Sequence, residues 1–330
     1  MKVKNKVKIL AIFLLIALSI FSFGFSSANA ESITYYLGGD VLGFTINTKG
    51  AEVVGFCDVI TDNGLKSPCK DGGVLVGDVI YNMGDCEINS AQDVANALNN
   101  YKSGEIVTKI SRKGEIKLVD VIPVKDLTGE YKLGVYIRDD LTGLGTVTFY
   151  KEDGSFASLG HPVSNQLGRL YDVVGGEVYN STIIGVIKPT KSKAGELRGM
   201  FVGEKSVGKI TKNTNVGLYG KISDFNESEH KKVEISKAKP GKAQIYSTVD
   251  GMIPKYYDIE IVKTDYFTNS NKNLVIKISD DDLLKITGGI LQGMSGSPII
   301  QYGKLVGAVT HVFINDGSRG YGISIDKMLN

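Results

Sequence analysis

The chain has 330 residues, more than a single hydrophobic core usually serves, so we expect two domains. A formal net charge of +2 gives no reason to expect nucleic-acid binding, and 42% hydrophobic with 22% charged residues is typical of a globular protein. Forty glycines against seven prolines favour many short strands joined by tight turns.

The N-terminal 30 residues have the pattern of an export signal. Lysines occupy every second position from Lys2 to Lys8, a largely apolar run covers residues 9–25, and Ala28 and Ala30 supply small residues after it. This order is typical of a signal peptide. The apolar run is marginal for a spanning helix, which needs about 20 residues, so both a cleaved signal peptide and an uncleaved anchor fit residues 1–30. We therefore expect export, with membrane association through the N-terminus.

Residues 31–125 predict a small αβ domain. A glycine-containing loop at 40–46 leads into a strand. Ser90 and Asp93 suit the N-terminus of a helix, because a serine cap and an acidic first turn both stabilise helix starts, and apolar residues then follow at helical spacing. Further strand patterns occupy residues 53–60, 75–84, 106–110 and 116–122.

This succession resembles a PDZ domain, most closely at Leu42-Gly43-Phe44 and at residues 75–80. The resemblance implies that an extended peptide adds to a sheet edge beside the helix. Backbone N–H groups of Leu42, Gly43 and Phe44 would then bind the terminal carboxylate of that peptide. A small αβ domain with no peptide ligand is the alternative.

All three cysteines, Cys57, Cys69 and Cys86, lie in this segment. In an exported chain Cys57 could pair with Cys69, but the odd count leaves one over, and three free thiols fit equally. Because no histidine lies nearby in the sequence, we expect no zinc site there.

Residues 126–330 predict a second, β-rich domain. Strands at this spacing, with few helical patterns between them, suggest a barrel or a sandwich. Residues 279–285 read as a capped helical turn. The strand patterns occupy residues 131–137, 145–150, 155–159, 183–187, 205–211, 216–221, 232–236, 243–249, 257–262 and 274–278.

A glycine-rich turn surrounds Ser295 near the C-terminal end of the chain. Gly293 and Gly296 allow backbone angles that other residues avoid, and Pro298 ends the turn before an apolar, isoleucine-containing run. A serine held there projects its hydroxyl, while the N–H groups of Gly293 and Ser295 would suit a tetrahedral oxyanion. A serine-rich β-turn without chemistry is the alternative.

The pattern resembles the nucleophile loop of chymotrypsin-like serine peptidases, with Ser297 at the second glycine of their usual G-x-S-G-G-P motif. Residues 304–312 predict a strand beyond this loop, which would form one wall of a substrate pocket. The wider stretch, residues 287–322, closely resembles the SpoIVB peptidase family, sporulation serine peptidases with a PDZ domain. The resemblance implies a mainly β fold, with a PDZ-like domain at 31–125 and a chymotrypsin-like double β-barrel at 126–330.

A serine nucleophile needs a base, and the chain has three histidines. His230 lies among charged residues and reads as solvent-exposed. His311 lies on the strand after the serine loop, and His161 lies between Gly160 and Pro162 at a loop position. The residues alone leave the choice between the last two close. The SpoIVB family carries its catalytic histidine in a similar Gly-His motif, so the resemblance favours His161.

A third catalytic group would be a carboxylate that orients the imidazole. In the SpoIVB family an aspartate fifteen residues before the serine has been linked to activity, and that offset falls on Asp280. Asp280 could equally serve only as the N-cap of the predicted helical turn. The other aspartates that we considered are Asp172, Asp250, Asp258, Asp265, Asp281 and Asp282.

The resemblance implies an exported serine endopeptidase that needs no cofactor and acts between the forespore and mother-cell membranes. Its implied partners are a regulator of an intramembrane protease, whose cleavage triggers processing of pro-sigma-K, and its own chain. Two other classes of protein fit the same pattern without chemistry. One is a peptide-binding PDZ adaptor of the spore envelope, and the other is a structural protein of that envelope.

Overall fold

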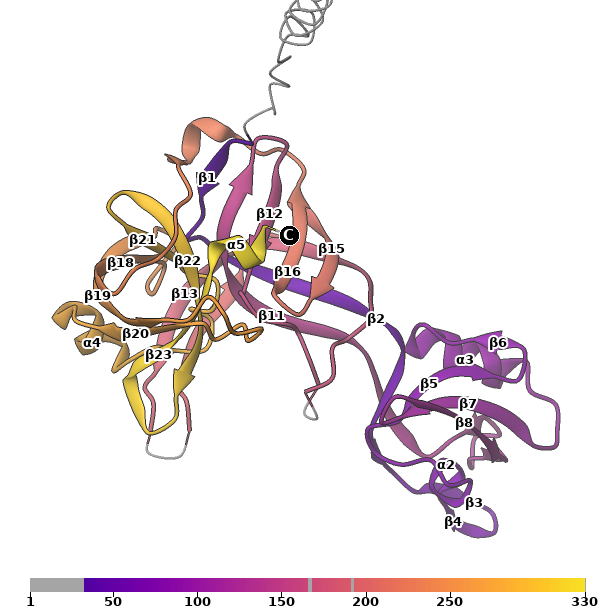
Figure 1. Cartoon of the computed structure of the whole chain (residues 1–330). Helices are drawn as coiled ribbons and strands as arrows, with labels where there is room; N and C mark the ends of the chain where they lie inside the picture. Colours follow the sequence, from indigo (N-terminus) through magenta and orange to yellow (C-terminus); the bar gives the residue numbers. More distant parts are fainter. Residues whose placement is uncertain (1–32, 166–167, 191–192, 330) are drawn as a thin grey trace, which may run out of the picture. The chain divides into compact units, whose positions relative to one another are not determined.

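The computed structural model describes residues 33–165, 168–190 and 193–329, so the expected signal segment lies outside the described residues. Strands make up most of the described chain (Figure 1). Within these residues, no helix is both long enough and apolar enough to cross a bilayer.

Six strands close into a first barrel. Each pairs with its neighbour, and the pairing of β2 with β11 completes the ring. Its interior is apolar, with Phe44, Val147, Phe156 and Leu218 all buried. In order around the ring, the strands are β2 (Val41–Phe56), β11 (Val135–Lys151), β12 (Ser155–Ser158), β16 (Gly217–Ile222), β15 (Gly208–Thr214) and β13 (Val173–Ile187).

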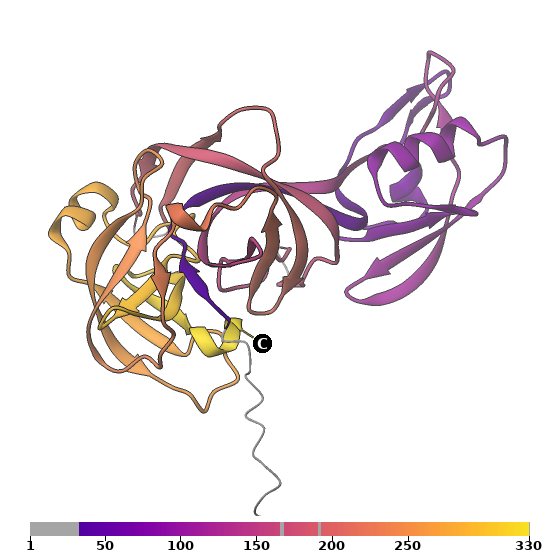
Figure 2. The same cartoon turned by 90° about the horizontal axis from the view of Figure 1, so that it is seen from above.

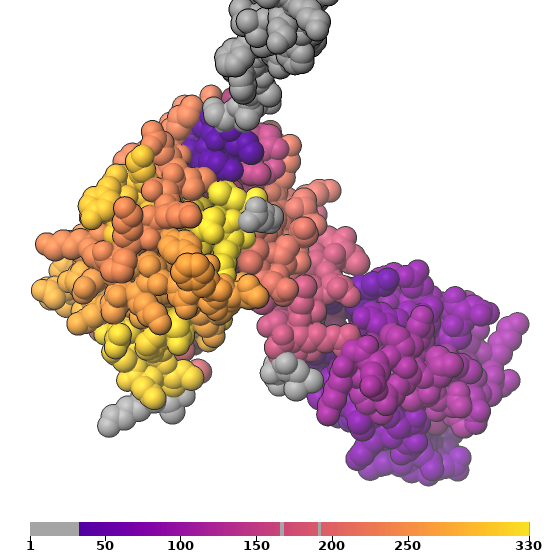
Figure 3. All heavy atoms as spheres, in the orientation of Figure 1, coloured from indigo at the N-terminus to yellow at the C-terminus, as the bar shows by residue number. Residues whose placement is uncertain are grey.

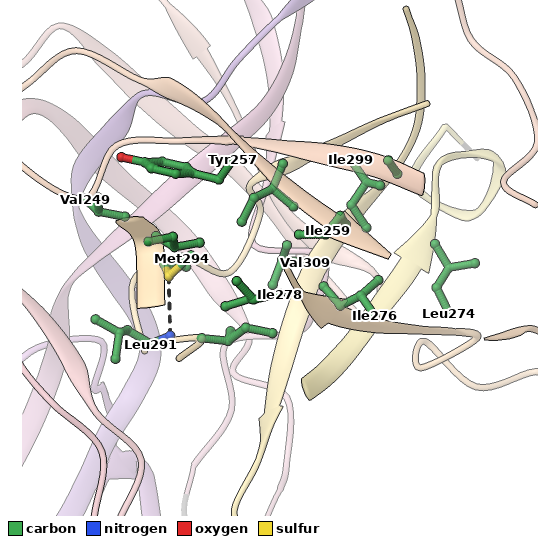
Figure 4. Packing of buried hydrophobic residues seen from close by; sticks show 14 of the residues in the cluster. Val249, Tyr257, Ile259, Leu274, Ile276, Ile278, Leu291, Met294, Ile299 and Val309 are labelled. Atoms are coloured by element: carbon green, nitrogen blue, oxygen red, sulfur yellow. Dashed lines mark hydrogen bonds between the residues drawn. The ribbon is translucent and has the colours of Figure 1, made fainter. Parts of the chain in front are cut away.

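A second barrel follows in the chain and has the same strand order, in which the third strand along the chain pairs with the sixth. Alternate residues of its strands point inward, as Ile259, Ile276 and Ile299 do in Figure 4. The ring consists of β18 (Gly241–Ser247), β19 (Lys255–Thr264), β20 (Leu274–Ile278), β23 (Asp316–Ser324), β22 (Lys304–Phe313) and β21 (Pro298–Gln301). The mainly β fold with barrels that the sequence predicted is therefore confirmed.

A separate apolar cluster joins the two barrels, with Phe149 and Ala157 from the first and Leu305 and Ile323 from the second. The short strand β1 (Tyr35–Leu37) pairs with β11 on one side and with β17 (Lys232–Val233) on the other. Figure 3 shows β1 in indigo beside orange residues of the segment that connects β16 to β18 and contains β17. The remaining elements are β14 (Glu196–Phe201), the 3-10 helix η1 (Glu227–Glu229), α4 (Asp281–Thr287) and α5 (Ile325–Met328).

An αβ segment is inserted between the first two strands of the first barrel. Strands β2 and β11 continue beyond the barrel as one long antiparallel ribbon, which Figure 2 shows. The inserted segment connects the far ends of these two strands. It contains β3 (Val59–Thr61), β4 (Gly64–Lys66), α2 (Pro68–Asp71), β5 (Val79–Met83), β6 (Cys86–Glu87), α3 (Ala91–Asn99), β7 (Ile106–Arg112), β8 (Glu115–Val121), β9 (Val124–Lys125) and β10 (Tyr131–Lys132).

The helix predicted here is present. Ser90 is the N-cap of α3, and its hydroxyl accepts a hydrogen bond from the backbone N–H of Asp93, as its position before an apolar-periodic run indicated. Val94 and Ala97 face the core of the segment. All three cysteines are free thiols in the structure.

The expected division at residue 125 differs from what the structure shows. Residues 41–48, which we had placed in the N-terminal domain, pair with β11 and β13 inside the first barrel. The reason is that β2 is a single strand that serves two cores in turn, with Phe44 and Ile46 in the barrel and Ala51 and Val53 in the inserted segment.

Candidate active site

The serine loop of the second barrel packs directly on the first. Gly293 and Gly296 both have φ near +97°, a conformation that favours glycine. A Cβ atom at Gly296 would overlap the carbonyl oxygen of Thr146 on β11. The glycines that the sequence placed around Ser295 are therefore required by a turn and by a close approach of two backbones.

Two threonines of β11 hold this loop in place. The hydroxyl of Thr146 donates to the Gly293 carbonyl at 2.8 Å, and its N–H donates to the Ser295 carbonyl at 3.1 Å. The hydroxyl of Thr148 donates to the Gly296 carbonyl at 2.8 Å. Because the carbonyl oxygens of the loop accept hydrogen bonds from the first barrel, they point toward β11, and the N–H groups of the loop point in other directions.

The loop has the features of an oxyanion site. The N–H groups of Gly293 and Ser295 have no hydrogen-bond acceptor among the described residues, and both residues line one cavity. The Ser295 hydroxyl donates to the Thr310 carbonyl at 2.6 Å. The neighbouring Ser297 is fully buried, and its hydroxyl bonds to Ser247 and to the Met294 carbonyl. Of the two serines, Ser295 is the one that a substrate can reach.

His161 reaches the same cavity from the first barrel, just after β12. The two residues before it, Leu159 and Gly160, have φ of +69° and +68°, and this conformation strains a leucine. Nδ1 of His161 lies 2.9 Å from the carbonyl oxygen of Pro162. Since a carbonyl can only accept, Nδ1 carries the proton and Nε2 keeps its lone pair, which is the tautomer that a general base needs.

The cavity has a volume of about 740 Å³ and is lined by residues of both barrels. His161, Ser295 and His311 lie along it together with Lys272. Burial is the main cause that lowers the pKa of His161 below its usual 6.5, and the positive charge of Lys272 adds to the effect. Burial, followed by the charges of His161 and Lys272, lowers the pKa of His311 to about 4. Both imidazoles are therefore neutral at physiological pH.

Asp280 does not reach this cavity. It is the N-cap of α4, where one carboxylate oxygen accepts from the Leu283 N–H at 2.8 Å and the other from the Asp258 N–H at 3.1 Å. It is not among the residues that line the cavity with His161 and Ser295. The expectation of Asp280 as the orienting acid needs correction, and the N-cap alternative accounts for its position in the structure.

The expected carboxylate-binding loop, Leu42-Gly43-Phe44, is a barrel strand. Its residues pair with β11 on one side and with β13 on the other, so their backbone groups are not available to a peptide. The ring of Phe201 fills the space beside Gly43. A substitution such as Gly43→Asp would therefore disturb the barrel and would not test peptide binding.

A second Gly-Phe pair lies nearer to a groove. Gly55 and Phe56 precede β3, which lines a cavity of about 500 Å³ together with α3 and residues 126–137. Val59, Ile60 and Leu98 are among its walls. The dipeptide occurs three times in the sequence, at Gly24-Phe25, Gly43-Phe44 and Gly55-Phe56. We considered only Gly43-Phe44, which follows the pattern of a loop entering a strand.

Two further residues, Asn213 and Lys272, support the site without having been predicted for it. The amide of Asn213 accepts from the Val163 N–H and donates to the carbonyls of Val163 and Tyr171, which fixes the loop after His161. Lys272 lies over the ring of Tyr321 at 5.4 Å and brings the cavity a positive charge. No pattern in the sequence distinguished these residues from ordinary surface residues.

His230 is not solvent-exposed, as its charged sequence neighbours had suggested. Its side chain is 19% exposed and packs on the rings of Tyr150 and Phe225, with Nδ1 at 3.9 Å from a carboxylate oxygen of Asp40. It is not among the residues that line the cavity of Ser295.

The part of the chain that forms the barrels matches a known protein family. The family model of the SpoIVB peptidases (S55) matches residues 129–329, which include every strand of the two barrels except β2. No curated protein matches the chain. The match covers more than half of the sequence and contains both the serine loop and His161. The chain therefore belongs to the SpoIVB peptidase family and is a serine peptidase of the sporulation type.

Proposed function

We propose that Ser295 is the nucleophile of an endopeptidase, that His161 is its general base, and that the N–H groups of Gly293 and Ser295 bind the oxyanion. The observation that carries this proposal is a single cavity that brings together a hydroxyl, a histidine with its Nε2 lone pair available, and two unpaired amides. These groups come from two different barrels, so only the folded chain assembles them.

In the reaction, the Ser295 hydroxyl first turns from the Thr310 carbonyl toward Nε2 of His161. Its oxygen attacks the scissile carbonyl while Nε2 takes the proton, and the two amides stabilise the negative oxygen. His161 then gives the proton to the leaving amine. A water molecule, deprotonated by the same nitrogen, releases the acyl group and restores Ser295.

We also propose that this peptidase acts outside the cytoplasm, in the space between the forespore and mother-cell membranes. Its substrates would be a regulator of an intramembrane protease and its own chain, and cleavage of the regulator would start pro-sigma-K processing. Family membership and the export pattern of residues 1–30 support this role.

A fluorophosphonate probe tests the catalytic proposal against a non-catalytic adaptor. We expect covalent labelling of the purified protein, with the modified peptide containing Ser295, because the probe reacts with an activated serine. Mass spectrometry locates the label. Ser295→Ala should remain unlabelled, whereas an adaptor would leave the wild type unlabelled as well.

The groove lined by β3, α3 and residues 126–137 suits recruitment of an extended peptide. It is largely apolar, and Ile60 on β3 presents a side chain that is 59% exposed. A peptide held there would reach the cavity of Ser295 at a raised effective concentration. We therefore propose that the inserted segment is a PDZ-like module that recruits substrate and takes no part in the cleavage reaction.

Ile60→Asp should impair cleavage of a protein partner by about tenfold and leave cleavage of a short, unstructured peptide unchanged. Because Ile60 is exposed, its replacement should have little effect on stability. Kinetic assays with both substrates provide the measurement. Leu65→Asp is a matched control, since Leu65 is 63% exposed on β4 but lies outside the groove. Equal losses with both substrates, or no loss with either, would contradict recruitment.

A further inference from the structure

The cavity of Ser295 contains no carboxylate among its described lining residues. Of the residues that the structure describes, the titratable and charged groups that face it are His161 from the loop after β12, His311 from β22, Lys272 from the connection before β20, and Tyr321 from β23. A serine peptidase commonly uses an acid to orient its histidine and to stabilise the imidazolium. Here another group must orient His161.

His311 is the group in contact with it. The two imidazole rings lie 5.0 Å apart between centroids, with their planes tilted by 49°. His311 also follows Thr310, whose carbonyl receives the Ser295 hydroxyl. Strand β22 therefore touches both members of the proposed catalytic pair through adjacent residues.

One nitrogen of His311 is unsatisfied. Its Nδ1 is buried and has no hydrogen-bond partner in the described structure. An unpaired buried polar atom destabilises the folded chain, so its presence indicates a compensating role. His311 is only partly buried and lines the cavity, so packing of the barrel core does not account for a histidine at this strand position.

We propose that His311 is the positioning residue of His161 and occupies the place in this site that a carboxylate holds in other serine peptidases. The proposal rests on the assignment of Ser295 and His161 above. The Pro162 carbonyl fixes the tautomer of His161, and the ring of His311 fixes its orientation and shields it from water. A neutral imidazole does this without repelling the cation that forms on His161 during acylation.

His311→Ala tests this role. We expect kcat to fall about 10- to 100-fold with KM within a factor of two, because a misplaced base slows chemistry without weakening binding. Removal of the ring also admits water to His161, which raises the pKa of His161 toward 6.5. The acid limb of kcat/KM should therefore move to higher pH, and NMR titration of His161 should show the same direction.

Two controls separate positioning from a merely structural effect. His230→Ala removes another half-buried histidine from outside the cavity and should leave kcat and the acid limb in place. His311→Gln keeps a polar side chain of similar reach and should recover part of kcat, and it also serves if the alanine variant does not fold.

Unchanged kcat and an unmoved acid limb in His311→Ala would overturn the proposal. A loss of thermal stability that accounts for the whole loss of activity would overturn it too. These outcomes would not affect the assignment of Ser295 and His161 as nucleophile and base. That assignment would be wrong if Ser295→Ala or His161→Ala remained active.

Discussion

Ser295→Ala should lower kcat by about 10⁶ and leave KM and the melting temperature close to those of the wild type. The loss is this large because the variant has no atom to form the acyl intermediate, and the remaining groups then act on water alone. The hydroxyl makes a single hydrogen bond, to the Thr310 carbonyl, so its removal has little effect on the fold. Steady-state hydrolysis of a peptide and a thermal melt provide the two measurements.

Ser297→Ala is the matched control for this prediction. Its hydroxyl is buried against Ser247 and the Met294 carbonyl, so the variant should lose stability while retaining most of its kcat. Activity of Ser295→Ala comparable with that of the wild type would show that the nucleophile lies elsewhere.

His161→Ala should abolish cleavage, with circular dichroism and the melting profile near those of the wild type. Without Nε2 of His161 the Ser295 hydroxyl loses its proposed general base, and a free hydroxyl is nearly inert at neutral pH. In the wild type the pKa of His161 lies below its usual value, so the base stays deprotonated in mildly acidic solution. The acid limb of kcat/KM should accordingly lie below pH 6.5.

His311 provides the comparison for that result. If His161 is the base, the alanine variant at His161 is inactive and the one at His311 retains a measurable rate with a shifted pH profile. An inactive His311→Ala beside an active His161→Ala would exchange the two roles.

Local patterns predicted much of the second barrel. Strand β20 has the bounds that alternation gave it, since Leu274, Ile276 and Ile278 all point to one interior. The glycines beside Ser295 likewise marked a turn whose backbone they alone can adopt. Such features depend on neighbours in the sequence, so the sequence reveals them.

Features that depend on distant contacts were harder to predict. The sequence predicted a strand only at residues 183–187, whereas β13 begins at Val173, and its Gly176 lies against the carbonyl oxygen of Thr45 on β2. The offset that selected Asp280 is a distance along the chain, and the structure places that residue at a helix start. The choice between His161 and His311 did not come from the residues alone, because both reach the cavity.

The insertion of the αβ segment within the first barrel has a consequence for the order of folding. Strands β2 and β11 are neighbours in the ring, yet residues 57–134 separate their paired ends. Each doubling of an unfolded loop adds about 0.6 kcal/mol to the cost of bringing its ends together. Once the inserted segment has folded, it acts as the tip of a hairpin and removes most of that cost. Since β11 also carries the threonines that hold the serine loop, we expect the nucleophile to reach its final place after the inserted segment, which takes no part in the chemistry, has formed.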